Sequence, residues 1–406
     1  MKFVNCVLFP LLFSLISGGS VAANPRPDEL YGRLIKIGKQ AQSSNNHETA
    51  TKAFSQAVRL SPQNPHAHLL LAANFLSQGQ QRRAEAYLHN QIKRPEQRAN
   101  ARVFMAAIAK LEHRRPFVLS SSFVLKPSSN VNNVSSQEFF DTLLGRFDID
   151  NGADEQFGIG IELGGKVLHR TPIKDGLSIE LSGAIYRAIY ENNGLRYWLA
   201  RLEADLKQIG PNEDWRIGIF ADRKAFTDVP NSNGELFSYG IRGYLNKRLS
   251  PKYQISFNAS AVQRDYLNAQ TLSGPVFNFE TTVRSVHARG RTSFHGLNIE
   301  RRRTKLDYHQ YWGIGVRAGF EYNMSQSLRF GLNGGVTIRE YDADFASVNF
   351  ARQDRIFKVG VSAIHKKIEI FGATPKLSCG YERQKSNIAL YSKKTTECQI
   401  GWFYRF

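Results

Sequence analysis

Beyond residue 116 the sequence alternates, residue by residue, between apolar side chains and polar or small ones. Trp198 and Leu202, for example, fall on one side of an extended chain, and Arg201 and Asp205 fall on the other. A period of two indicates β-strands with two different faces. The apolar face continues for nine or more residues, enough for a tilted strand to cross hydrocarbon. The other face carries charges that a dry core would not tolerate, so the pattern predicts a membrane-spanning β-barrel with a wet interior.

A sheet in a bilayer must pair every edge, so these strands are expected to close into a cylinder. The alternation divides residues 116–406 into about fourteen strands, and it is weakest over 279–303, where histidines and arginines interrupt it. Long and short connections alternate, and short turns face the periplasm in outer-membrane barrels. The strands are expected to begin near Phe117, Phe157, Leu177, Tyr197, Trp215, Phe237, Tyr253, Phe279, Ser293, Trp312, Leu328, Ile356, Thr374 and Glu397.

Composition excludes other classes of protein. The 406 residues are 42% hydrophobic and 12% aromatic, which is too apolar for a disordered chain. After the N-terminal segment no apolar run reaches the roughly 18 residues that a membrane-spanning helix needs. Residues 1–23 contain Lys2, an apolar stretch and Val21-Ala22-Ala23, which predicts a signal peptide cleaved after Ala23. The mature chain is therefore expected in an oxidising compartment.

Residues 24–115 have helical spacing and predict a small α-helical module. Asn64 and Pro65 are expected to start one helix and Gly79 to end it. Small and apolar residues recur after 31 positions, which resembles degenerate tetratricopeptide repeats; a generic α-hairpin bundle is the alternative. The expected buried faces are Leu30, Leu34, Ile37 and Ala41; Ala50, Ala53, Phe54, Ala57, Val58 and Leu60; Leu69, Leu70, Ala73 and Leu76; and Ala84, Leu88 and Ile92.

The helical module is strongly basic, with 15 Lys or Arg against 6 Asp or Glu in a chain of net charge +19. Because an exported chain does not meet nucleic acid, this charge favours acidic client proteins or lipid head groups as partners. Arg82 and Arg83 are candidate client contacts, and a merely solvated basic surface is the alternative.

Charged residues of the inward-facing parity are expected to line the barrel interior as salt-bridge ladders rather than as a selectivity filter. No catalytic, nucleotide-binding or metal-binding signature accompanies them, so we expect a protein that is not an enzyme and that uses no cofactor or metal. The charged residues expected to line the barrel interior are Glu162, Glu180, Arg201, Glu203, Asp205, Arg216, Asp222, Arg242, Arg317, Glu321, Arg329 and Arg339.

Two predictions concern the last two strands. Their alternation places Cys379 opposite Cys398 on the outward face, where we expect a disulfide; two free lipid-facing thiols are the alternative. The final residues resemble the recognition strand that barrel-assembly machinery reads in outer-membrane proteins. Its candidate residues share one face and are Ile400, Trp402, Tyr404 and Phe406.

The sequence predicts an α+β multidomain chain with three parts: a signal peptide (1–23), a periplasmic helical module (24–115) and a transmembrane antiparallel barrel of about 14 strands (116–406). This order of parts resembles the surface lipoprotein assembly modifier family. That family is also described as the outer-membrane component of a type XI secretion system. Residues 127–133 are similar to the Asn-rich segment that follows the first barrel strand in that family, and Asn130, Asn132 and Asn133 are candidate client or loop contacts. A folded loop held by its own Asn and Ser side chains is the alternative.

The resemblance implies an outer-membrane translocon that moves client proteins from the periplasm to the cell surface. Its clients would be surface lipoproteins or secreted haemophore-like proteins that bind haem or metal. Periplasmic chaperones, the barrel-assembly machinery and outer-membrane lipid would be its other partners. Two further classes stay open: a passive porin, and an exporter of an anionic polysaccharide.

Overall fold

The computed structural model describes residues 26–137, 139–143, 145–148, 155–227, 234–346, 348–370 and 373–405, so the expected signal peptide lies outside the described residues. The chain divides into two compact units, residues 1–84 and 85–406. No helix among the described residues is both long enough and apolar enough to cross a bilayer.

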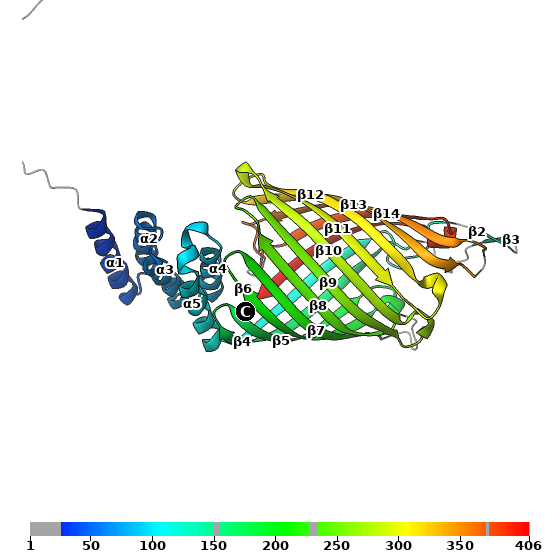
Figure 1. Ribbon diagram of the computed structural model, residues 1–406, viewed down its shortest axis with the longest axis horizontal. Coiled ribbons are helices and arrows are strands. Elements are labelled where there is room, and N and C mark those ends of the chain that lie inside the picture. The colour runs from blue at the N-terminus through cyan, green and yellow to red at the C-terminus, as the bar shows by residue number, and fades with distance from the viewer. Residues whose placement is uncertain are drawn as a thin grey trace, which may run out of the picture. The chain divides into compact units, whose positions relative to one another are not determined.

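The N-terminal part of the described chain is helical (Figure 1). Its helices are α1 (Pro27–Ser43), α2 (His47–Leu60), α3 (Pro65–Ser77), α4 (Gln81–Ile92), the 3-10 helix η1 (Pro95–Asn100) and α5 (Ala101–Arg114). The predicted ends of α3 are confirmed. The Asn64 side chain accepts a hydrogen bond from the main-chain N–H of His66 at 3.0 Å, and Pro65 is the first helical residue. Gly79 follows the helix with φ +72°, the left-handed conformation that favours glycine.

The buried faces of α2 and α4 follow the prediction closely, although Leu60 is exposed. The prediction for α1 is wrong at Ile37, which is also exposed. Its neighbour Gly38 is buried instead, because the Phe54 ring lies where a Cβ at residue 38 would stand. In α1 and α2 the chain thus uses a close backbone approach that hydrophobic spacing does not reveal.

The predicted face of α3 is also wrong, because Leu69, Leu70, Ala73 and Leu76 are not its buried residues. Residues 67–76 are mostly apolar around the whole helix, so their spacing does not select a face. Two buried polar residues set the orientation through hydrogen bonds. The ring nitrogen Nε2 of His68 lies 2.9 Å from the Pro62 carbonyl oxygen, and Asn74 donates to Thr51 Oγ1 at 2.8 Å. The buried face comprises Ala67, His68, Leu71, Ala72, Asn74 and Phe75.

The rest of the described chain forms a closed antiparallel barrel of fourteen strands (Figure 1). Each strand pairs with its neighbours in sequence, and the first, β1, also pairs with the last, β16. A separate hairpin, β2 (Phe139–Thr142) and β3 (Gly145–Asp148), lies in the first long loop. The barrel strands are β1 (Phe117–Ser128), β4 (Gly158–Lys174), β5 (Leu177–Ile189), β6 (Tyr197–Ile209), β7 (Glu213–Phe226), β8 (Leu236–Arg248), β9 (Tyr253–Tyr266), β10 (Gly274–Val286), β11 (Arg291–Arg302), β12 (Tyr311–Asn323), β13 (Leu328–Asp344), β14 (Ala351–His365), β15 (Lys376–Ser386) and β16 (Lys393–Arg405).

The predicted fold class and strand number are confirmed, but two strands begin five residues earlier than expected. We expected β10 to begin near Phe279, yet Pro275 pairs with Gln263 as the second residue of β10, a position near a strand end where proline is tolerated. We expected β14 to begin near Ile356, but it begins at Ala351. There Arg352 and Asp354 form an ion pair at 2.6 Å and both are buried, so the charges are satisfied within the barrel.

The two faces of the wall differ as the alternation predicts. Large apolar side chains such as Leu202, Ile219 and Val359 are exposed on the outward face, which suits contact with hydrocarbon. Cys379 lies directly opposite Cys398 on this face, and their sulfur atoms are bonded. This bond ties β16 to β15. It does not tie β16 to β1.

Candidate functional site

The inner face of strands β4–β8 carries a network of opposite charges that we call the charge ladder. Arg242 bonds Glu203 at 2.7 Å and Asp205 at 2.8 Å. Arg216 continues the network, at 3.5 Å from Asp205 and 3.0 Å from Glu180. Every rung pairs a cation with a carboxylate, so the ladder presents a polar wall in which five cations share three carboxylates. Its members are Lys166, Arg170, Glu180, Glu203, Asp205, Lys207, Arg216 and Arg242.

The twelve charged residues predicted to line the barrel belong to such pairs, with one exception. Arg329 instead donates from Nε to Asn323 Oδ1 at 3.2 Å. On the far side of the barrel the pairs include Arg339 with Glu300 at 3.1 Å and Arg284 with Glu321 at 3.6 Å. This arrangement agrees with the ladder interpretation and not with a ring of like charges that would select ions.

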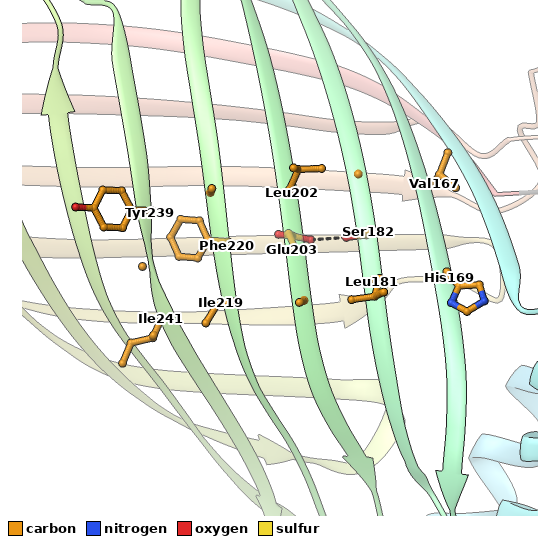
Figure 2. Close-up of a pocket in the computed structure, with 14 residues that line it drawn as sticks. Val167, His169, Leu181, Ser182, Leu202, Glu203, Ile219, Phe220, Tyr239 and Ile241 are labelled. Atoms are coloured by element: carbon orange, nitrogen blue, oxygen red, sulfur yellow. Dashed lines mark hydrogen bonds between the residues drawn. The ribbon is translucent and has the colours of Figure 1, made fainter.

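The outward face of the same strands carries a shallow apolar hollow of roughly 730 Å³ (Figure 2). Leu181, Leu202, Ile219 and Ile241 line it from four neighbouring strands, and small residues such as Gly183 form its floor. The Ser182–Glu203 hydrogen bond of 2.9 Å, also drawn in Figure 2, belongs to the charged inner side. We assign this hollow to the lipid-facing wall and not to a polar binding site.

Helices α4 and α5 contact the short-turn end of the barrel through Arg170 of β4. Its guanidinium lies 3.4 Å from Glu112 of α5, 3.9 Å from Glu85 of α4 and 3.1 Å from Glu180 of β5. All four side chains are buried, so this is the point where the charge ladder continues from the barrel wall into the helices. We call residues 85–114 the anchored helices.

A second set of bonds holds the anchored helices to the turn between β6 and β7 and to the end of β8. Lys93 donates from Nζ to Asp214 and to the Gly210 carbonyl oxygen, both at 2.5 Å. Arg98 donates to Asn212 at 2.9 Å, and Arg248 donates to the Lys93 carbonyl oxygen. These contacts were not predicted. The available signal was that Glu85 and Glu112 are acidic residues on the apolar helix faces of a strongly basic module.

His89 lies beside the Arg170 cluster and makes the contact sensitive to pH. Burial, assisted by Lys207 and Arg170, lowers the pKa of His89 from 6.5 to about 4. Above pH 6.5 the imidazole is neutral whether or not the helices are docked, so the contact is at full strength. As the pH falls from about 6.5 to about 4, the undocked His89 takes up a proton that the docked one does not, so docking weakens.

We therefore expect the hydrogen-exchange protection of residues 101–114, corrected for intrinsic rates, to fall between pH 7.5 and pH 5. Replacement His89→Gln should remove this loss. Burial raises the pKa of Glu112, and protonation of this residue favours the docked state, so the variant should if anything gain protection in acid. An equal loss in both proteins would contradict the role of His89.

The junction between β1 and β16, which we call the seam, has a short strand register. β1 pairs with β4 along its whole length, Phe117–Ser128, but with β16 only over Ser120–Leu125 and again at Ser128. This is the shortest register between neighbouring barrel strands in the part of the chain that the structure describes. Lys126 and Pro127 have no partner in β16, and Pro127 has no N–H to donate.

The Asn-rich segment of the first loop fastens the seam at the long-loop end. Asn130 is buried, and its Nδ2 donates to the carbonyl oxygens of Val134 at 3.0 Å and Lys394 at 3.3 Å. Lys393 Nζ donates to Asn133 Oδ1 at 2.6 Å, and Asn132 accepts from the main-chain N–H of Gln156 at 3.2 Å. The three predicted residues therefore lie together and support a folded loop. Their contact with a client stays a prediction.

A polar hollow of roughly 600 Å³ lies beside the seam on the inner face. Lys126 and Asn130 line it from β1 and the first loop, and Glu382 and Glu397 line it from β15 and β16. Lys126 also bonds Glu162 at 2.8 Å. Mixed charges beside a weak junction form a space that a hydrated polypeptide segment could occupy.

The other predicted site residues stay apart from the seam hollow. Arg82 is exposed, and Arg83 lies 4.2 Å from the centre of the Phe75 ring and donates to Gln80. Among the recognition-strand residues, the Trp402 ring packs 5.4 Å from Phe123 across the seam. Ile400 and Tyr404 share its parity, and Phe406 lies outside the described residues.

No group of three or more His, Cys, Asp or Glu side chains in the described part is placed to hold a metal ion.

A closed fourteen-strand antiparallel barrel with an apolar outer face and a paired-charge interior defines an outer-membrane β-barrel protein. The chain belongs to the surface lipoprotein assembly modifier family, whose model matches residues 118–404. Surface lipoprotein assembly modifier 1 of Haemophilus influenzae is 26% identical over 234 residues, which is 53% of this chain and 45% of that protein. The matched region thus spans less than half the length of this relative.

Solved outer-membrane proteins resemble the chain only distantly. OmpT of Vibrio cholerae has a TM-score of 0.39 at 10% identity, over 71% of this chain and 99% of that one. OprD of Pseudomonas aeruginosa has a TM-score of 0.34 at 9% identity, over 71% and 95%. A bacterial polysaccharide outer membrane secretin has a TM-score of 0.38 at 9% identity, over 70% and 98%. Similarity this low says nothing about the function of this chain.

Proposed function

We propose that this chain is an outer-membrane translocon that moves client proteins from the periplasm to the cell surface and releases them through the seam. The observation that carries this proposal is the short register between β1 and β16 beside a polar hollow. Family membership supports surface lipoproteins as the client class, and secreted haemophore-like proteins are the second client class.

Opening the seam separates a short strand register and the bonds that join the Asn-rich segment to β16. Each backbone hydrogen bond contributes only about 0.5–1.5 kcal/mol net in water, but an unpaired edge in hydrocarbon costs several times more. A client segment in extended conformation can satisfy that edge while it passes, since it offers the same donors and acceptors as the strand it replaces. The Cys379–Cys398 bond keeps β16 attached to β15, so β1 is the strand free to separate.

The orientation of the barrel follows from its connections. The anchored helices and the short turns lie at the same end, and short turns of outer-membrane barrels face the periplasm. The basic helical module is then available to capture clients that periplasmic chaperones deliver. Because the periplasm lacks ATP, folding of the client outside the cell supplies the direction of transport. The barrel itself reaches the membrane through the barrel-assembly machinery.

Co-expression with a neighbouring exported lipoprotein in a heterologous Gram-negative host tests this function. Protease shaving of intact cells should remove the client only when this chain is present. A variant lacking residues 24–115, with the leader retained, should lose client display while its barrel still shows heat-modifiable mobility in electrophoresis. Unchanged display by that variant would argue against capture by the helices, and display in the absence of the chain would overturn the proposal.

A further inference from the structure

Four cations lie together on the outward face at the long-loop end of β14, β15 and β16. We call this group the cationic patch, and its members are Arg355, Arg383, Lys385 and Lys394. Each is exposed, and Arg355, Arg383 and Lys385 share the parity of the exposed apolar residues of their strands. Lys394 pairs directly with Arg383 and so lies on the same face. The inward neighbours on the same strands, such as Asp354 and Gln384, are buried, so the alternation places the four cations outside the barrel.

The register brings like charges into direct opposition. Arg355 pairs with Lys385 between β14 and β15, and Arg383 pairs with Lys394 between β15 and β16. Like charges directly opposite each other in a sheet are destabilising. No carboxylate lies within 4.0 Å of these four side chains among the described residues, whereas Arg301, another outward cation at this end, is held by Asp342 at 2.5 Å. The patch therefore lacks an internal anion of the kind that Asp342 supplies to Arg301.

The surroundings of the patch favour a lipid as the source of that anion. On the same face of β14, the exposed side chains of Phe357, Val359 and Val361 lie between Arg355 and the short-turn end. On β15, the exposed side chains of Tyr381 and Leu377 lie between Arg383 and that end. A cationic end above an apolar strip matches a molecule with a phosphorylated head and acyl chains. A soluble acidic polypeptide would match the charges of the patch but would not cover the apolar side chains beside it.

We propose that the cationic patch binds the phosphate groups of a lipid headgroup in the leaflet at the long-loop end. The two arginines are suited to bidentate contact with phosphate oxygens, and the two lysines add charge beside them. The patch lies next to the seam, because Lys394 is on β16, yet lipid binding there does not depend on transport. Loss of client display would leave this proposal intact.

The test uses the full-length mature protein in neutral detergent and measures its affinity for lipid A, which carries two phosphates. The double variant Arg383→Gln/Lys385→Gln removes one partner from each opposed pair. At about 1 kcal/mol, or roughly fivefold, for each cation, its affinity should fall about 30-fold. The charge-matched control Lys366→Gln/Lys367→Gln, at the short-turn end, should bind as the unaltered protein does. Equal affinity of the double variant and the control would overturn the proposal.

Four further measurements identify the ligand and exclude misfolding. Dephosphorylated lipid A should bind weakly, and inorganic phosphate at the same concentration should not compete. Competition by a poly-glutamate peptide as strong as that by lipid A would show a polypeptide site and reject the lipid. Without lipid, the double variant should keep its heat-modifiable mobility to at least the temperature of the unaltered protein, since two repulsive pairs are gone; a lower temperature would contradict the unpaired-charge argument.

Discussion

A disulfide across the seam should abolish client display. Phe123 and Trp402 face each other directly between β1 and β16 on the outward side. Phe123→Cys/Trp402→Cys, made in a background in which Cys379 and Cys398 are serine, allows an oxidant or a short crosslinker to join the two strands. If clients leave through the seam, surface display should fall by about tenfold or more, because a bonded edge cannot accept a passing strand. Protease shaving and antibody labelling of intact cells measure the loss.

A matched crosslink on the other side of β1 shows whether the loss of display comes from a blocked exit or from a damaged barrel. Phe123 also lies opposite Leu163 of β4, and Phe123→Cys/Leu163→Cys fixes β1 to its other neighbour. Display should survive in that variant and should return in the seam variant on addition of a reductant. Normal display with a fully crosslinked seam would place the exit elsewhere, and an open lumen would then be the route to examine.

The barrel could be predicted in detail because its physical surroundings impose one simple rule. Hydrocarbon outside and water inside give every strand the same period of two, so parity assigned the charged residues to one face and set Cys379 opposite Cys398. The rule missed the first residues of β10 and β14. At the start of β14 the alternation does not reveal that Asp354, two residues away, neutralises Arg352 inside the barrel.

Helical faces and contacts between distant segments were less predictable. In α3 the apolar residues surround the helix, and the hydrogen bonds of His68 and Asn74 decided which side is buried. The contact of the anchored helices with the barrel joins Glu112 to Arg170, which are 58 positions apart, so no local pattern contains it. The seam likewise depends on the register between the first and last strands. Local sequence thus predicts the wall and leaves its junctions to be found in the structure.

Replacement of Arg170 should release the anchored helices while the barrel stays assembled. Removing one partner of a buried ion pair costs about 3–5 kcal/mol, because the carboxylate left behind is neither solvated nor neutralised. In Arg170→Met, Glu112 and Glu85 both lose their contact with Arg170, and Glu112, the closer of the two at 3.4 Å, bears most of that cost. Glu180 keeps Lys207 at 2.8 Å and Arg216 at 3.0 Å. Hydrogen exchange over residues 101–114 should accelerate by two orders of magnitude or more, as about 3 kcal/mol requires. Heat-modifiable mobility of the barrel should not change.

The second substitution Glu112→Gln shows whether the loss comes from the unpaired carboxylate. Burial already raises the pKa of Glu112, so the protein partly disfavours its anionic form and a neutral amide should cost little by itself. In Arg170→Met/Glu112→Gln the α5 carboxylate that faced the lost guanidinium is also absent, so much of the lost protection should return, giving a coupling energy between the two residues. If the double variant were as unprotected as Arg170→Met alone, the arginine would act through packing. If Arg170→Met left residues 101–114 fully protected, the bonds of Lys93 and Arg98 would be sufficient to hold the helices.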